Sequence, residues 1–291
     1  MHSIIEIISK FSTHENCIAG ICDALPLLQN TAGFTPFVSS NILKRTDPAA
    51  SLAGVKSIIV IGIENKIEAF PPMPEDAGVL SVLGVVDDYH ITVRRLLEKL
   101  VAEFRHVFDF NYKILVDSPN LCERTLAVKA GLGFIGRNGL LISPEYGSRF
   151  NIGLLLTDIQ LASGVETGRA GARPLRCCFH GCNKCIEACP SGALSYDGYD
   201  VSRCISYLTQ KDSLTCGEAK LIGRQLYGCD ICQNACPFNS PQPIAWAKPC
   251  DWLAMSDADF TKTYGHTAML WRGTKLLRRN AEIVKKNIAE F

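Results

Sequence analysis

Two cysteine-rich runs limit what this chain can fold into. Residues 182–190 and residues 229–237 both read C-x2-C-x3-C-P, the tail of the bacterial ferredoxin motif. Closely spaced cysteines on a tight loop reach different irons of one cubane cluster, whereas the last cysteine binds the other cluster. We expect that last cysteine to begin a helical turn, where proline fits because the first helical positions need no amide donor. The pattern therefore predicts two 4Fe–4S clusters.

Each run supplies three cysteines, so each cluster needs one more ligand from elsewhere. The full motif would place that ligand at positions that are here Phe179 and Leu226. For the first run, Cys178 is the nearest substitute and Cys177 is the runner-up. For the second run, Cys204 can reach the cluster through space. The predicted ligands are Cys178, Cys182, Cys185 and Cys236 for one cluster, and Cys189, Cys204, Cys229 and Cys232 for the other.

Two other metal sites fit the paired C-x2-C units less well. Zinc sites use such pairs, but a zinc ribbon does not require the swapped cysteines before proline. A c-type haem is excluded because neither C-x2-C unit is followed by histidine. Two clusters this close pass electrons in sequence, so the simplest function is that of a ferredoxin-like carrier.

The overall composition is that of a globular protein with reduced thiols. The 291 residues include 14 cysteines, ten of them between Cys177 and Cys236, and the formal net charge is +1. Residues 1–16 form an amphipathic pattern that lacks the regions of a signal peptide, and no apolar run is long enough to span a bilayer. We therefore expect a cytoplasmic location, no membrane contact, and cysteines that bind metal and do not form disulfides.

The part of the chain before the cysteines predicts an α/β (α+β) domain. Strand-like runs alternate with helical patterns, the strands at residues 55–64 and 112–117 and the helices at residues 88–104 and 121–131. Such alternation favours a sheet covered by helices. A change of composition at residues 162–174 marks a boundary. The expected domains are 1–170 (α/β), 171–245 (ferredoxin-like, double 4Fe–4S) and 246–291 (a short helical segment).

Two features of the α/β domain are candidates for a site. Residues 131–136 match G-x-G-x-x-G, but they follow a predicted helix and not a strand, so we do not expect a nicotinamide site. Asp117 ends a predicted strand. There it or Ser118 either caps the next helix, or Asp117 supplies a carboxyl group at a strand end where α/β sites form. His90 reads as a helix-start residue and not as a metal ligand.

Four motifs follow one another over roughly residues 45–240: VDS…ER.LA..AGLGFIGRNGLLISPEYGS, C.KCIEACPSGAL, RCISYLTQ and LYGCDICQNACPFN. In order and spacing they resemble the epoxyqueuosine reductase family. The resemblance implies a cobalamin-binding α/β domain followed by a double 4Fe–4S domain. It also implies a reductase that converts the epoxide of epoxyqueuosine in tRNA to the alkene of queuosine through cob(I)alamin. Electrons would come from an external low-potential donor of the flavodoxin or ferredoxin type.

The resemblance further implies roles for individual residues. Asp117 is the expected proton donor, a carboxylic acid with a raised pKa. The residues expected to face the cobalamin are Ser118, Gly133, Gly136, Arg137, Asn138, Gly147, Ser148, Arg224 and Tyr227. The family's partition of the cluster cysteines agrees with the partition made above from spacing.

Two of the chain's departures from the family pattern affect the predicted ligands and substrate. Three residues separate Cys178 from Cys182 where the family usually has two. The longer members continue into a helical-repeat region that helps to hold tRNA, whereas this chain stops after one basic helix. Its basic residues either touch phosphate or form a solvated face, and they are Arg272, Lys275, Arg278, Arg279, Lys285 and Lys286.

These departures keep two alternative functions open. The first is a related reductase with the same cofactors that acts on a small molecule or on the corrinoid of a partner protein. The second is an electron-transfer module without cobalamin. The retained Asp117 and the glycine-rich residues 131–136 argue against the second alternative.

Overall fold

The chain divides into two compact units. The computed structural model describes residues 4–27, 36–161 and 177–290. Unit 1 comprises residues 1–64 and 89–180, and unit 2 comprises residues 65–88 and 181–291. The predicted boundary at residues 162–174 lies outside the described residues, so the division at residue 170 stays a prediction.

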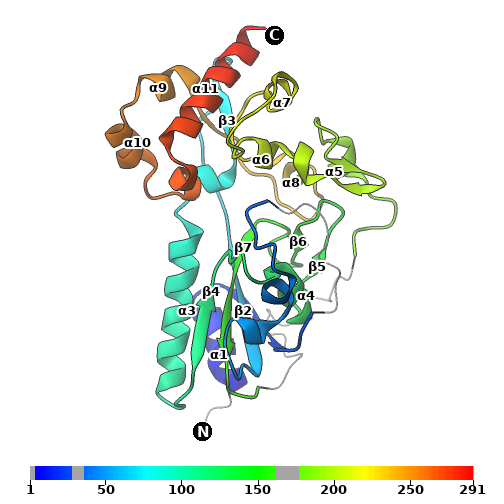
Figure 1. Cartoon of the computed structure of the whole chain (residues 1–291), viewed down its shortest axis with the longest axis vertical. Helices are drawn as coiled ribbons and strands as arrows, with labels where there is room; N and C mark the ends of the chain where they lie inside the picture. The colour runs from blue at the N-terminus through cyan, green and yellow to red at the C-terminus, as the bar shows by residue number, and fades with distance from the viewer. Residues whose placement is uncertain (1–3, 28–35, 162–176, 291) are drawn as a thin grey trace. The chain divides into compact units, whose positions relative to one another are not determined.

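Unit 1 is built on a four-stranded antiparallel sheet in the order β1-β2-β7-β4 (Figure 1). The strands are β1 (Ile18–Asp23), β2 (Ser57–Glu64), β4 (Tyr112–Leu115) and β7 (Phe150–Thr157). β2 and β7 pair along their whole length, from Ser57 opposite Thr157 to Glu64 opposite Phe150. The predicted strands are confirmed as β2 and β4.

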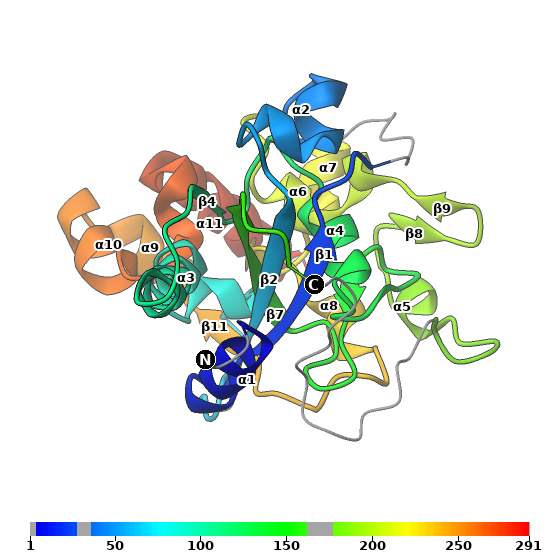
Figure 2. The ribbon, with the colours of Figure 1, turned by 90° about the horizontal axis from the view of Figure 1, so that it is seen from below.

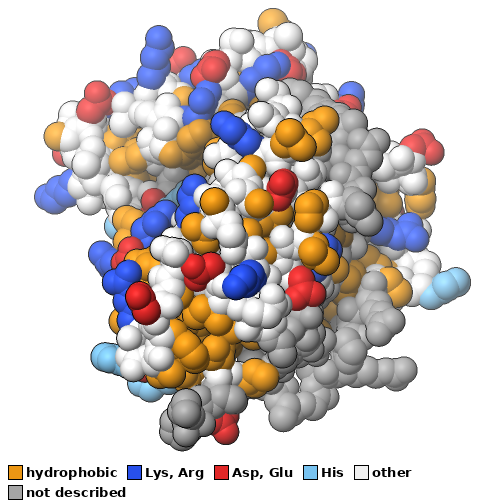
Figure 3. Space-filling view, turned by 60° about the horizontal axis from the view of Figure 1, so that its bottom comes forward, with side chains coloured by type: hydrophobic (Ala, Val, Ile, Leu, Met, Phe, Trp, Pro, Cys, Tyr) orange, Lys and Arg blue, Asp and Glu red, His pale blue; other side chains and the backbone are white. Residues whose placement is uncertain are grey.

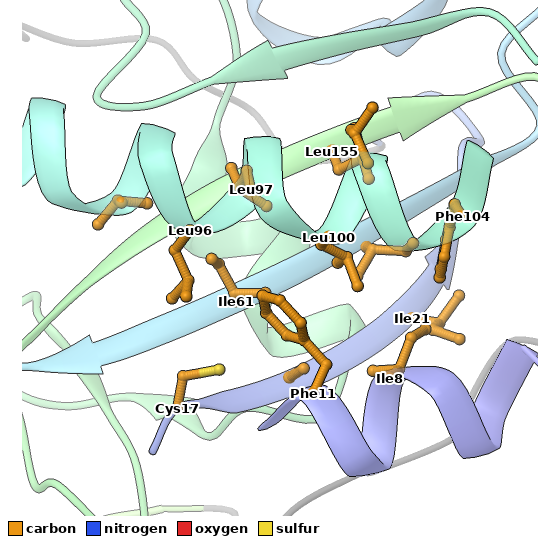
Figure 4. Packing of buried hydrophobic residues seen from close by; sticks show 14 of the residues in the cluster. Ile8, Phe11, Cys17, Ile21, Ile61, Leu96, Leu97, Leu100, Phe104 and Leu155 are labelled. Atoms are coloured by element: carbon orange, nitrogen blue, oxygen red, sulfur yellow. The ribbon is translucent and has the colours of Figure 1, made fainter. Parts of the chain in front are cut away.

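Helices cover both faces of this sheet. They are α1 (Ile4–His14), α3 (Tyr89–Arg105) and α4 (Glu123–Lys129). On one face Ile59 and Ile61 pack with α1 and α3, as Figure 4 shows for Ile61. On the other face Ile58 and Val60 pack with α4, and Figure 2 shows the sheet between α3 and α4. Because successive residues of a strand point to opposite faces, burial on both sides explains the continuous apolar run of β2.

The glycine-rich residues 131–136 lead from α4 into a short hairpin of unit 1. Its strands are β5 (Phe134–Ile135) and β6 (Leu141–Ile142), which pair antiparallel. A dinucleotide motif would open a helix at this point, so the rejection of a nicotinamide site agrees with the structure. The remaining short elements of the unit are α2 (Ile42–Thr46) and the 3-10 turn η1 (Pro48–Ala50).

Unit 2 is built on a three-stranded sheet whose middle strand comes from far upstream. β3 (Gly78–Leu80) pairs parallel with β10 (Gln225–Tyr227) and antiparallel with β11 (Ala245–Ala247). This pairing places residues 65–88 in unit 2, whereas the sequence division included them in the α/β domain. The short elements of the unit are η2 (Val82–Gly84), α5 (Lys184–Glu187), β8 (Leu194–Ser195), β9 (Gly198–Tyr199), η3 (Val201–Arg203), α6 (Ile205–Leu208), α7 (Cys216–Leu221) and α8 (Ile231–Asn234).

The C-terminal helices complete the core of unit 2. They are α9 (Pro249–Ala254), α10 (Asp257–Tyr264), the 3-10 helix η4 (Ala268–Arg272) and α11 (Thr274–Ala289). Leu277, Ala281 and Val284 follow helical spacing along α11 and are fully buried in one cluster with Trp252. The predicted terminal helix is thus confirmed, and one of its faces belongs to the core.

The arginines of the C-terminal segment bind within unit 2. Arg272 is paired with Asp212, and Arg279 donates a hydrogen bond of 3.0 Å to the carbonyl oxygen of the same residue. Arg278 lies 2.7 Å from the carboxylate of Asp257. The exposed basic side chains of the predicted set are Lys275, Lys285 and Lys286.

The described surface is mixed in charge. On the face shown in Figure 3, Lys and Arg side chains are interspersed with Asp and Glu side chains. This distribution agrees with the formal net charge of +1. Within the part of the chain that the structure describes, no helix is both long and apolar enough to cross a membrane.

Two buried asparagines tie α11 to the middle of unit 2. Asn280 is fully buried, and its Nδ2 donates to the carbonyl oxygens of Thr209 (2.8 Å) and Leu226 (2.9 Å). About two turns later, Asn287 donates to the carbonyl oxygen of Gly223 at 2.9 Å. The helix therefore supplies donors to backbone carbonyl oxygens in the middle of unit 2.

We expect Asn280→Ala to destabilise unit 2 by about 2 kcal/mol or more, because two buried carbonyl oxygens lose their donor. Anaerobic urea denaturation followed by tryptophan fluorescence reports on this unit, because Trp246, Trp252 and Trp271 all lie in it. Glu282→Ala, at an exposed position of the same helix, should leave the midpoint unchanged. Equal midpoints for the two variants would contradict the role given to Asn280.

Candidate functional site

Asp117 lies just beyond the end of β4, in a backbone conformation that is uncommon for residues other than glycine. Its φ is +48°, in the left-handed region that residues with a Cβ seldom occupy. Such a conformation is strained and persists where surrounding contacts hold it.

Glu123, the first residue of α4, holds the backbone at this point. Its Oε2 accepts the N–H of Asp117 at 3.1 Å, and its Oε1 accepts the N–H of Ser118 at 2.7 Å. The N-cap residue of α4 is Cys122, whose side chain makes no capping hydrogen bond. A capping residue would accept an N–H of the helix with its own side chain. Here the N–H groups of Asp117 and Ser118 donate to the side chain of Glu123 instead, so the prediction that either residue caps α4 is wrong.

Two residues from the start of α3 reach the Asp117 carboxyl group. Tyr89 Oη donates to Asp117 Oδ2 at 2.7 Å, and His90 Nε2 lies 3.6 Å from the same oxygen. The Tyr89 and His90 rings stack with their centroids 4.1 Å apart. His90 is a helix-start residue as predicted. Its contact with Asp117 cannot be read from local sequence, because it depends on the packing of α3 beside β4.

These contacts separate the acidities of two carboxyl groups. Hydrogen bonds from His90 and then from Tyr89 hold the pKa of Asp117 below its ordinary value. The expectation of a raised pKa at Asp117 is therefore wrong. Burial raises the pKa of Glu123 to about 8, although the N–H groups of Ser118 and Asp117 oppose that shift. Of these two neighbouring carboxyl groups, Asp117 is therefore the stronger acid and Glu123 the weaker one.

The glycine-rich loop and the turn that follows β6 lie side by side in unit 1. A Cβ on Gly133 would come within 2.0 Å of the Ile142 carbonyl oxygen, so only glycine fits there. The next residue, Ser143, exchanges two backbone hydrogen bonds with Gly147, at 2.7 and 3.0 Å. The structure thereby brings together the predicted residues of these two segments, which are Gly133, Gly136, Arg137, Asn138, Gly147 and Ser148.

A side chain of α4 connects this loop to the Asp117 backbone. Arg124 donates to the carbonyl oxygen of Gly139, at the tip of the β5–β6 hairpin. Its neighbour Glu123 binds Asp117 and Ser118 on the other side. One short helix therefore positions both the candidate catalytic loop and the candidate cofactor loop.

Asn138 has a buried hydrogen-bond donor that a cofactor bound in unit 1 could use. The residue is 5% exposed, and its Oδ1 accepts the N–H of Leu140 at 3.2 Å. Its Nδ2 has no hydrogen-bond partner among the described residues. A buried donor without an acceptor is costly, so this group fits a polar ligand with acceptor oxygens. The amide side chains of a corrinoid carry such oxygens, and the residues of this loop fit the predicted cobalamin.

The two predicted cofactor residues of unit 2 are engaged within that unit. Arg224 Nε donates to the carbonyl oxygen of Ala77 at 3.0 Å. Tyr227 is 5% exposed, and its Oη donates to the carbonyl oxygen of Ala268 at 3.3 Å. Gln225, which lies between them in the sequence and was not among the predicted cofactor residues, is buried, and its Oε1 has no partner among the described residues. In the sequence, its role as a candidate is indicated only by its being a polar residue next to apolar ones in a short strand.

The thiols of the second cysteine run affect one another's ionisation. Burial raises the pKa of Cys229 to about 12, and charge on Cys204 or Cys189 adds to the shift. Burial also raises the pKa of Cys232, with further contributions from Cys229 and Cys204. Charge on Cys204 therefore contributes to the raised pKa of both Cys229 and Cys232. Bound iron would lower the pKa values of these thiols and so favour their thiolate forms.

The last cysteine of each run follows a helical turn. Cys189 comes after α5 and Cys236 comes after α8. Each begins a single turn as expected, because its carbonyl oxygen accepts the N–H of the residue three positions later, Gly192 at 3.2 Å and Asn239 at 3.0 Å. Burial by itself raises the pKa of Cys189, but N–H groups of Leu194, Ser191 and Ala193 outweigh it and lower the pKa. Hydrogen bonds of this kind to sulfur also tune the potential of a bound cluster.

The other cysteines differ in how far they are buried. Cys178 is half-buried and Cys177 is exposed, and the choice between them as a ligand stays a prediction. Cys17 and Cys22 are buried in unit 1, where burial raises their pKa values to about 11 and about 12. Among the residues with described positions, no three His, Cys, Asp or Glu side chains are arranged to hold a single metal ion.

Comparison with known protein families identifies both parts of the chain. Residues 45–118 match the family described as epoxyqueuosine reductase QueG, DUF1730. Residues 177–239 match the 4Fe-4S double cluster binding domain. The prediction of two 4Fe–4S clusters is therefore confirmed, and the zinc alternative is rejected.

Similarity over most of the chain gives the same result. The epoxyqueuosine reductase of Lactococcus garvieae (strain Lg2) is 36% identical over 273 residues, which cover 87% of this chain and 75% of that protein. A crystal structure of epoxyqueuosine reductase with an epoxyqueuosine-modified tRNA-Tyr stem loop matches with a TM-score of 0.86 and 27% identity, over 98% of this chain and 82% of that one. The Bacillus subtilis enzyme, in a structure with its catalytic aspartate loop swung out of the active site, matches with a TM-score of 0.85, 27% identity and the same coverage. This chain therefore belongs to the epoxyqueuosine reductase family.

Proposed function

We propose that this reductase converts the epoxide of epoxyqueuosine in tRNA to the alkene of queuosine, with cobalamin beside its two clusters and with Asp117 as proton donor. The observation on which the proposal rests is the Tyr89–His90–Asp117 network in a chain that also has a double-cluster domain. Two relatives support it, because one is bound to an epoxyqueuosine-modified stem loop and another has an aspartate on its catalytic loop.

The balance of the reaction defines what the site has to supply. An epoxide that becomes an alkene takes up two electrons and two protons and loses its oxygen as water. The clusters pass electrons one at a time, which calls for an external low-potential donor such as a flavodoxin or a ferredoxin. When bound, cobalamin supplies the nucleophilic chemistry at the substrate carbon, while the protein binds, orients and protonates.

Asp117 transfers a proton to the departing epoxide oxygen. Its side chain is 67% exposed in the described chain, so a substrate can approach it. Because its pKa is lowered, the carboxylate is the resting form and a neighbour has to resupply the proton. His90 Nε2, 3.6 Å from Oδ2, is that neighbour, and the Tyr89 hydroxyl fixes the same oxygen at 2.7 Å.

We assign the cofactors to the residues predicted from the sequence, with one change. The clusters bind to Cys178, Cys182, Cys185 and Cys236, and to Cys189, Cys204, Cys229 and Cys232. Cobalamin contacts in unit 1 come from Ser118 and the two adjoining loops, with Asn138 Nδ2 as the available donor. In unit 2, Gln225 is a better candidate than Arg224 or Tyr227, whose polar groups bind backbone oxygens. The chemistry of these thiolates suits a cytoplasmic location.

A second substrate class, a small molecule, is favoured by one observation. Of the six basic residues predicted for phosphate contact, Arg272, Arg278 and Arg279 bind inside unit 2. Only the lysines of that set are exposed, which reduces the charge that α11 offers to an RNA backbone.

We expect Asp117→Ala to lower turnover by about a hundredfold or more, the range typical of a lost general acid. Iron content and cobalamin binding should stay at wild-type levels, because Asp117 is not among the proposed cluster ligands or cobalamin contacts. Asp109→Ala, at an exposed position of unit 1, serves as the control. Single-turnover assays with pre-reduced protein measure the step directly, and wild-type turnover in Asp117→Ala would refute the assignment.

We expect Cys178→Ala to lower the iron content, because one cluster loses a ligand, whereas Cys177→Ala should keep it. Iron analysis with electron paramagnetic resonance of the anaerobically reconstituted proteins measures the difference. Cys250→Ala controls for the loss of an exposed thiol. The reverse order for Cys177 and Cys178 would transfer the ligand role to Cys177.

We expect epoxyqueuosine within a tRNA anticodon stem loop to be converted faster than the free nucleoside. Mass spectrometry of digested RNA and of the nucleoside reaction measures both rates under the same reductant. Lack of conversion of either substrate by protein that contains both clusters and cobalamin would reject epoxyqueuosine and favour the second substrate class.

A further inference from the structure

The first residue of α4 is turned back toward the loop that precedes it. Both carboxyl oxygens of Glu123 accept backbone N–H groups, those of Asp117 and Ser118, at 3.1 and 2.7 Å. Glu123 is half-buried, and the helix behind it is anchored by Leu126 and Ala127, which are fully buried. The side chain is therefore a pair of acceptors on a fixed support, directed at the backbone of the candidate proton donor.

The loop needs such a support because its conformation is strained. A residue with a Cβ is disfavoured at φ +48°, so Asp117 stays there only while nearby contacts outweigh the strain. Residues 116–122 form no helix or strand, so the regular hydrogen bonds of a ladder do not hold them. The two hydrogen bonds to Glu123 fix consecutive peptide groups, which restricts the rotation that would release Asp117 from its left-handed conformation.

The position of the Asp117 side chain depends on that backbone. Its Oδ2 meets Tyr89 Oη at 2.7 Å and His90 Nε2 at 3.6 Å, and both partners sit on α3, a different helix from Glu123. If the loop relaxed, the carboxyl group would move relative to both groups. An error of about 1 Å in the position of a catalytic group can cost about a hundredfold in rate.

We propose that Glu123 is a positioning residue that holds residues 117–118 in place, so that Asp117 meets Tyr89, His90 and the substrate. The proposal rests on the function proposed above, since it treats Asp117 as the proton donor. Glu123 does not touch the substrate. It acts through the backbone of Asp117, and its own neighbour Arg124 connects the same helix to the loop of Asn138 through Gly139.

The test compares Glu123→Ala and Glu123→Gln with a matched control on the same helix, Lys129→Ala, whose side chain is exposed. Alanine removes both acceptors, whereas glutamine keeps one acceptor oxygen of similar position. Hydrogen–deuterium exchange of peptides covering residues 115–121 measures the loop without any cofactor chemistry. Turnover and KM with the epoxyqueuosine stem loop, in protein with a full iron content, measure the consequence.

In Glu123→Ala the amides of the loop should exchange about tenfold faster, as expected for the loss of a hydrogen bond. Its kcat should fall by tenfold or more with KM unchanged, and its thermal midpoint and iron content should stay close to those of Lys129→Ala. Glu123→Gln should lie between Glu123→Ala and the wild type in both exchange and kcat. Such a graded result separates positioning from a general loss of structure.

Two results would overturn the proposal. The first is unchanged loop exchange in Glu123→Ala, which shows that other contacts hold Asp117. The second is faster exchange together with wild-type kcat, which shows that the conformation of the loop does not limit the reaction. If Asp117→Ala itself keeps wild-type turnover, the proposed function fails, and the exchange measurement still tells whether Glu123 holds the loop.

Discussion

Thiolate–iron ligation is the interaction on which unit 2 depends. The helices that surround its predicted ligands are four to six residues long, and helices of that length are not stable alone. In the proposed partition each cluster takes cysteines from both runs, so ligation would tie residues near 180 to residues near 236. The α11 helix also stabilises this part of unit 2, because the side-chain amides of Asn280 and Asn287 donate to the carbonyl oxygens of Thr209 and Gly223.

Unit 1 holds Asp117 in a strained backbone conformation just beyond the end of a regular sheet. The sheet is buried on both faces, so it is a stable frame from which the loop after β4 projects. Around Asp117, an accepting carboxyl group binds the backbone while a hydroxyl and an imidazole bind the side chain. Backbone and side chain are thus fixed from two different helices, and two neighbouring carboxyl groups acquire opposite pKa shifts.

The parts of this structure that are local in sequence could be predicted from it. The apolar run at 55–64, the helical periodicity at 88–104 and the cysteine spacing each determine their element or ligand type within a few residues. The placement of β3 could not be predicted, because three residues between proline-rich and helical segments contain no signal for a partner as distant as β10. The lowered pKa of Asp117 was missed for a related reason, since its main cause, His90, lies on another element. Glu123 was present in the quoted motif, but its role depends on a left-handed backbone that no pattern of residue types reveals.

The insertion of residues 65–88 into unit 2 has a consequence for the biosynthesis of the protein. Ala77 accepts a hydrogen bond from Arg224, which is 147 residues further along the chain. As the polypeptide leaves the ribosome, β3 is complete long before either of its neighbouring strands exists. Until then it is a strand with two open edges beside a growing set of unligated thiols, which is the kind of intermediate that aggregates. Unit 1 needs β7 to complete its sheet, and β7 is synthesised before β10 and β11, so unit 1 can close while β3 still lacks both of its neighbours.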